Sequence, residues 1–173
     1  SPERLRSIAE SKLKMMEATV KEIKNAAEEL KLIQRGEKPV VKMFEGKEGQ
    51  FAILQDIIKT KPATIEDFTN DDAYEKLFDE TELKPYKEQL DRLNIHTRVI
   101  AKKNSPQVLA RKNVKGKRIS RKDIDFNGNV TVYGNKVAIS SLRTKMMGVI
   151  IESEDIAQTV HALFQLAWES RLE

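Results

Sequence analysis

Apolar residues near the start of the chain recur at alternating spacings of four and three. The stretch from Pro2 to Arg35 has no glycine and no further proline, and Gly36 and Pro39 follow it as stop signals. This pattern predicts one helix of about nine turns with a coiled-coil seam. We expect the seam to form a homodimer through Ala9, Leu13, Met16, Val20, Ile23, Ala27 and Leu30.

A second interpretation of this helix stays open at this point. Leu5, Ile8, Met15 and Ile33 widen the apolar stripe. An ordinary amphipathic helix that packs on the core of its own chain shows the same widening. We prefer the dimerising helix, because the intervening polar residues have the character of a fully solvated face.

After Gly36 the pattern changes to short strands that alternate with helices. Apolar runs predict strands at 40–44, 64–68 and 95–101. Amphipathic stretches predict helices at 46–59, 71–78 and 82–93, and Ser105-Pro106 indicates a short helix through Arg111. Such alternation favours an α/β domain with a partly parallel sheet.

The last third of the chain predicts a β-hairpin, one more strand and a final helix. The dipeptide Gly134-Asn135 separates apolar runs at 130–133 and 136–140, as in a two-residue hairpin loop. A strand at 147–151 and an amphipathic helix opened by Ser153 follow. The predicted fold class is therefore α/β, with a coiled-coil helix over 1–36 and a mixed-sheet domain over 37–173.

Composition excludes several kinds of site. The chain has no cysteine, which removes disulfides, thiolate metal sites and cysteine nucleophiles. Its two histidines, His96 and His161, have no second histidine at metal-ligand spacing, so we expect no metal and no cofactor. No apolar run reaches bilayer length. We expect a cytoplasmic protein without a membrane partner.

Charge is concentrated in one basic stretch. The 31 Lys and Arg exceed the 27 Asp and Glu by four, yet residues 102–122 alone hold nine basic residues and no acid. Such a stretch is typical of phosphate binding, and Lys115, Lys117 and Arg118 are our candidates for an anion site. A solvated loop is the more common explanation of such a stretch, and no aromatic residues interleave with the charges to stack on bases.

Three segments together resemble a known family. The hairpin at 130–139, the stretch at 148–157 and the helix end at 163–168 resemble the C-terminal region of TrmB-type transcriptional regulators. Residues 37–39 and 44–49 look like the start of the same region. The resemblance implies a fold similar to phospholipase D for the C-terminal domain and a linker helix before it. It also implies that DNA is bound only through a winged-helix domain, which we expect before Ser1.

The same resemblance bears on catalysis. Phospholipase D enzymes use a His-x-Lys pair and a later Asp, and the histidine attacks phosphorus while the lysine stabilises charge. With the hairpin in register, these three positions hold Phe126, Gly128 and Tyr133. None of these side chains can replace the lost groups. The resemblance therefore implies that the chain is not an enzyme.

We predict an effector-sensing and dimerising region of a TrmB-like regulator. Relatives often bind sugars, through aromatic faces and polar groups. The candidate ligand-binding residues lie at predicted strand ends or near the lost catalytic positions, although each has an alternative role in packing: Phe44, Glu45, Thr69, Asn70, Phe126, Tyr133 and Ser141.

Two other functions stay open. One is a phospholipase D-superfamily protein that binds or processes nucleic acid through residues 102–122. The other is a purely structural dimerisation module whose pocket is filled by its own side chains.

Overall fold

The computed structural model describes residues 2–35, 38–102, 112–119, 126–142 and 146–170. It divides into two compact units, Ser1–Pro39 and Val40–Glu173, and each is described by itself. The predicted short helix at 106–111 lies outside the described residues.

The first unit is the helix α1 (Pro2–Gln34), which confirms the helix predicted from the apolar spacing. The i,i+4 pair Arg6–Glu10 and the i,i+3 pair Glu28–Lys31 stabilise its polar surface. A single helix cannot cover an apolar stripe by itself. Five of the predicted seam residues have large apolar side chains that are exposed on α1. They are Leu13, Met16, Val20, Ile23 and Leu30.

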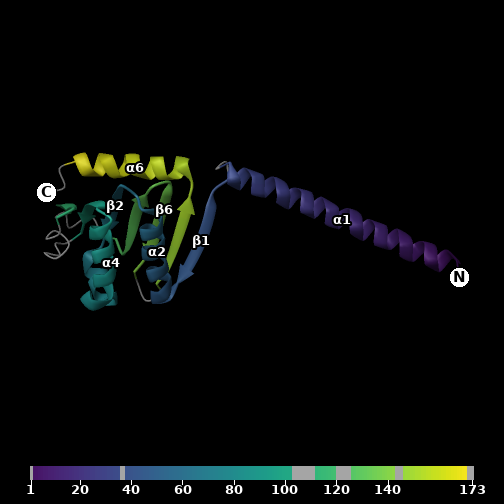
Figure 1. Ribbon diagram of the computed structural model, residues 1–173, viewed down its shortest axis with the longest axis horizontal. Helices are drawn as coiled ribbons and strands as arrows, with labels where there is room; N and C mark the ends of the chain where they lie inside the picture. The colour runs from purple at the N-terminus through teal and green to yellow at the C-terminus, as the bar shows by residue number, and fades with distance from the viewer. Residues whose placement is uncertain (1, 36–37, 103–111, 120–125, 143–145, 171–173) are drawn as a thin grey trace. The chain divides into compact units, whose positions relative to one another are not determined.

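The second unit contains a mixed sheet with the strand order β1-β7-β6-β5-β2-β3-β4. The parallel pairs are β2–β3 and β3–β4, and the other pairs are antiparallel. The α/β fold class with a mixed sheet is thus confirmed (Figure 1). The strands are β1 (Val40–Glu45), β2 (Thr64–Thr69), β3 (His96–Ala101), β4 (Val114–Arg118), β5 (Gly128–Tyr133), β6 (Lys136–Ser141) and β7 (Met147–Glu152).

Helices cover both faces of this sheet. The helices α2 (Gly46–Thr60) and α4 (Glu80–Arg92) pack on one face, where Ile57 and Leu90 join Ile65 and Tyr133 in one cluster. The helix α6 (Glu154–Glu169) packs on the other face, where Ala157 meets Val132 and Val137. Neighbouring strand residues point to opposite faces, so Val132 and Tyr133 belong to different clusters.

Polar side chains fix where the helices begin. Asn70 caps α3 (Asp71–Leu77), and Ser153 caps α6. Asp79 and Glu82 form a reciprocal capping box at the start of α4. The helix therefore begins at Glu80, two residues earlier than the sequence pattern predicts.

The strand β4 corrects one expectation. Residues 114–118 of the basic stretch pair with β3 in parallel, so the solvated-loop interpretation is wrong for this part. The edge of β3 offers unpaired backbone groups that a further strand satisfies. Lysines are tolerated at such an edge, because they extend into solvent and discourage further pairing.

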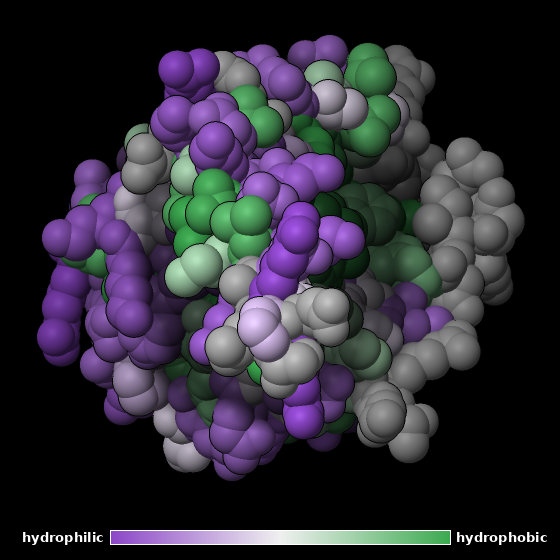
Figure 2. Space-filling view, turned by 90° about the vertical axis from the view of Figure 1, so that its right-hand side faces the viewer, coloured by the Kyte–Doolittle hydropathy of each residue, from purple (hydrophilic) through white to green (hydrophobic). Residues whose placement is uncertain are grey.

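Among the described residues, no helix is both long enough and apolar enough to cross a bilayer. The face drawn in Figure 2 is mainly hydrophilic, with hydrophobic residues gathered between the polar ones.

Candidate functional site

Phe126 stands where the resemblance places the histidine nucleophile. Its ring lies against Phe68, with ring centroids 4.6 Å apart. Both rings pack on a buried cluster of Ile100, Ile119 and Phe164, under α6. An apolar cluster therefore occupies this position, and it offers no group that can attack phosphorus.

Gly128 stands where the resemblance places the lysine. A Cβ atom added here would lie 2.4 Å from the carbonyl oxygen of Ser140, on the paired strand β6. The close approach is to backbone, which cannot rotate away as a side chain end can. The two strands can therefore pair at this distance only because residue 128 lacks a side chain.

Tyr133 stands where the resemblance places the aspartate, and it lies on the opposite face of the sheet from Phe126. It is 1% exposed, and its hydroxyl donates to Oδ2 of Asp56 at 3.0 Å. Lys136 Nζ lies 2.9 Å from the same oxygen. Burial opposes ionisation of Asp56, but the hydrogen bonds from Lys136 and Tyr133 bring its pKa below the usual value.

The structure brings together three of the candidate ligand residues. Thr69 Oγ1 and the backbone N–H of Asn70 both donate to Oδ1 of Asn129, at 2.9 and 3.2 Å. The Asn70 amide donates to the carbonyl oxygen of Phe126 at 2.6 Å. These polar groups bind one another, and Asn129, which the sequence analysis did not single out, is their shared acceptor.

The remaining candidates lie elsewhere. Phe44 packs against the cluster under α2. Glu45 and Ser141 are both cross-strand partners of Met147, one from each side of β7. The candidate set therefore does not converge on one cavity.

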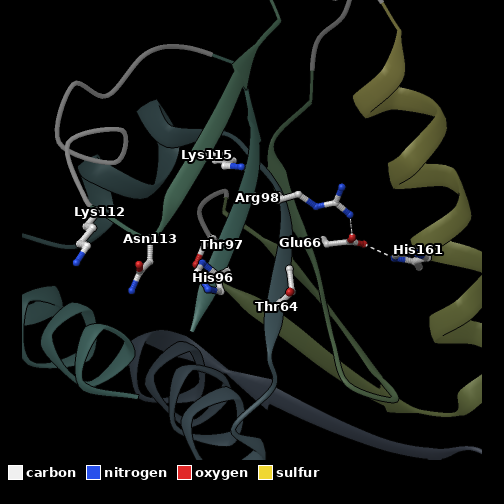
Figure 3. A pocket seen from close by; sticks show the side chains of 9 residues that line it. All are labelled: Thr64, Glu66, His96, Thr97, Arg98, Lys112, Asn113, Lys115 and His161. Atoms are coloured by element: carbon white, nitrogen blue, oxygen red, sulfur yellow. Dashed lines mark hydrogen bonds and ion pairs between the residues drawn. The ribbon is translucent and has the colours of Figure 1, made fainter. Parts of the chain in front are cut away.

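A cavity of about 420 Å³ opens at another place, beside β2, β3 and β4 (Figure 3). Its lining has three fixed cations, two histidines and one acid, together with three neutral polar residues. The lining residues are Thr64, Glu66, His96, Thr97, Arg98, Lys112, Asn113, Lys115 and His161.

Glu66 organises the wall of this cavity next to α6. Its side chain is 5% exposed and binds three donors at once. His161 Nδ1 lies 2.7 Å from Oε2, Gln165 Nε2 donates to Oε1 at 3.0 Å, and Arg98 also donates to Oε1. Figure 3 shows Arg98 and His161 converging on this carboxylate from β3 and α6. A buried carboxylate needs such partners, since desolvation penalises its charge.

Aromatic rings as well as hydrogen bonds hold the guanidinium of Arg98. Its guanidinium carbon lies 5.3 Å from the ring centroid of Phe164 and 5.4 Å from that of Trp168. Its Nη1 also donates to Oε1 of Gln165 at 3.2 Å. Stacking and hydrogen bonds together keep the guanidinium in one orientation.

The predicted anion residues separate into different environments. Lys115 lines the cavity. Lys117 instead donates to the carbonyl oxygen of Trp168 and lies 5.5 Å from its ring centroid. Arg118 alternates with Lys117 along β4 and so points to the opposite face. The sequence analysis missed Lys112 and Arg98 as neighbours of Lys115, although period two places His96 and Arg98 on one face.

The described residues contain no group of three or more acidic or histidine side chains that could hold a metal ion.

Comparison with known proteins gives a result at the level of the fold. No family model and no curated protein matches the sequence. Among solved structures, NucT from Helicobacter pylori matches with a TM-score of 0.56 and 10% identity over 77% of this chain and 98% of its own. Nuc from Salmonella typhimurium, described as a phospholipase D family member, matches with a TM-score of 0.53 and 12% identity over 76% of this chain and 95% of its own.

A third match is TrmBL2, described as an archaeal chromatin protein with a novel mode of DNA binding. It has a TM-score of 0.53 and 14% identity over 95% of this chain and 68% of its own. The chain thus has a phospholipase D-like fold, as the resemblance to the TrmB C-terminal region implied.

Proposed function

We propose that this chain is the effector-sensing and dimerisation region of a TrmB-like transcriptional regulator. One observation carries the proposal. The structural matches to NucT and Nuc extend over about three quarters of this chain, which is close to the fraction of the chain that Val40–Glu173 makes up. The match to TrmBL2 extends over 95% of this chain. A match of that extent includes most of α1. The combination of a long helix and a phospholipase D-like domain is therefore what this chain shares with TrmBL2.

The exposed seam of α1 supports the dimerisation part of the proposal. Five large apolar side chains spaced for a coiled coil are exposed on the helix. A partner helix would bury them in a knobs-into-holes interface. A helix of this length spans about 50 Å, which is enough to transmit a shift in the effector domain to a DNA-binding domain.

Sedimentation of a seam variant tests this proposal. Val20→Asp combined with Ile23→Asp is expected to convert a dimer into a monomer, because it places charges in an apolar interface. Ser11→Asp combined with Asn25→Asp adds the same two charges outside the seam, so it is the matched control and should leave the dimer intact. A dimer that survives the Val20/Ile23 change would rule out the coiled-coil assignment.

The surroundings of the three positions that correspond to the phospholipase D catalytic residues support the absence of catalysis there. Phe126 is packed against Phe68, Gly128 has no room for a side chain, and Tyr133 is buried on the other face. In place of a reactive pocket, this part of the domain has packed side chains and satisfied hydrogen bonds.

DNA binding by the basic stretch is a second candidate, favoured by the description of TrmBL2 as a DNA-binding chromatin protein. Binding to a DNA duplex should then weaken steeply with salt. Replacing Lys115, Lys117 and Arg118 with Gln should reduce the slope of log K against log salt by about one for each lost phosphate contact. An unchanged slope would exclude this candidate.

A further inference from the structure

We propose that the cavity between β2, β3, β4 and α6 binds the phosphoryl group of a small phosphorylated metabolite. The evidence that this cavity binds an anion comes from the side chains that line it. Its role as the effector site rests on the proposed function. The cavity adjoins Thr64 and His96, the first residues of β2 and β3, whereas Phe126 contacts Phe68 near the last residue of β2. It is therefore a different place from the position of Phe126.

The charge balance of the cavity favours an anion. Glu66 is the only acid among its described lining residues, and Arg98 already pairs with it. Lys112 and Lys115 remain as positive charge without an acidic partner among the described residues. Both lysines line the cavity, so a bound dianion would be attracted by two positive charges.

Arg98 gives the cavity a preorganised donor. A guanidinium has five N–H donors, and contacts with Glu66 and Gln165 engage only part of this set. The stacked rings of Phe164 and Trp168 fix its plane. An arginine held in this way loses little side-chain entropy when its remaining N–H groups bind a phosphate oxygen.

The size and lining indicate a metabolite in preference to a neutral sugar or a polymer. A volume of about 420 Å³ is in the range of small-molecule pockets. None of its described lining residues is Phe, Tyr or Trp. A neutral sugar or a nucleic-acid base therefore lacks the large aromatic face of a Phe, Tyr or Trp to stack on. Recognition must come from charge and polar donors.

Calorimetric titration of the full chain tests this site with glucose 6-phosphate, glucose and inorganic phosphate as probes. We expect glucose 6-phosphate to bind, inorganic phosphate to bind more weakly and glucose to give no signal. Lys112→Gln combined with Lys115→Gln should weaken glucose 6-phosphate binding about tenfold, since two partly solvated charge contacts are lost. Both side chains are exposed, so the fold should persist.

Lys59→Gln combined with Lys84→Gln removes the same charge from exposed positions on α2 and α4 and is the matched control. It should leave the affinity unchanged. Equal weakening in both variants, or no binding of either phosphate probe, would overturn the proposal. Tighter binding of a single-stranded oligonucleotide through Lys112 and Lys115 would also overturn it, in favour of a nucleic-acid site. The dimer test of α1 is independent of these outcomes, so a failure here can be told apart from a failure of the proposed function.

Discussion

Glu66 and His161 are 95 residues apart in the sequence, and His161 Nδ1 lies 2.7 Å from the Glu66 carboxylate. The contact joins β2 to α6. Because Arg98 on β3 and Gln165 on α6 bind the same carboxylate, one buried side chain ties two strands to the helix that covers them. The wall of the basic cavity is therefore also a structural junction.

Glu66→Gln is expected to lower the free energy of unfolding by roughly 2–4 kcal/mol, because it leaves Arg98 without its carboxylate in a mostly buried position. Chemical denaturation measures this effect. Glu28→Gln removes an exposed i,i+3 partner of Lys31 and should change stability very little. Equal effects of the two substitutions would show that the contacts of Glu66 contribute no more to the free energy of unfolding than an exposed ion pair does.

The raised pKa of Asp67 predicts that the free energy of unfolding depends on pH. Burial raises its pKa to about 6, while a hydrogen bond from Thr131 Oγ1 at 2.8 Å partly offsets this. The folded state therefore holds a proton that the unfolded state releases near its ordinary pKa of 3.8. Between these values the folded state binds more protons, so the contribution of Asp67 to stability decreases as pH rises from about 4 to 6.

Asp67→Asn should remove this dependence and keep an acceptor for Thr131. Above pH 7 we expect the variant to be more stable than the parent by roughly 1–3 kcal/mol, and near pH 3.5 the two should be similar. Urea unfolding at a series of pH values measures the difference. A stability difference that does not change with pH would contradict the raised pKa.

Gly128 and Gly148 offer a matched pair of glycine substitutions. A Cβ at either position would lie 2.4 Å from another atom, which is the Ser140 carbonyl oxygen for Gly128 and Ile53 Cδ1 for Gly148. The end of an isoleucine side chain can change rotamer, whereas a paired strand cannot move alone. Gly128→Ala should therefore lower the melting temperature more than Gly148→Ala does, and the reverse order would contradict this account.

We expect no phosphodiesterase activity. The wild-type chain and Phe126→His should both fail to release nitrophenol from bis(4-nitrophenyl) phosphate, because a restored histidine still lacks the neighbouring lysine that stabilises phosphate charge. Turnover by the wild type that Phe126→Ala or His161→Ala abolishes would show that a catalytic site persists.

Local patterns predicted much of this fold. The 3.5-residue spacing predicted α1, and Gly134-Asn135 predicted the hairpin of β5 and β6, since both depend on residues close in sequence. Gly134 has the positive φ of 58° that such a loop requires. Together with the resemblance to the TrmB C-terminal region, the register of the hairpin also predicted which residues stand at the catalytic positions of phospholipase D enzymes.

The sequence by itself determined the helices and most strands, because these follow from periodicity and local backbone preference. Only the tertiary structure decided that Val114–Arg118 forms a strand, because that depends on the free edge of β3. It also decided that Phe126 and Tyr133 lie on opposite faces and that Arg98, Lys112 and Lys115 share a cavity with Glu66 and His161. Such groupings arise from strand order and helix packing between segments far apart in the chain, which no local pattern records.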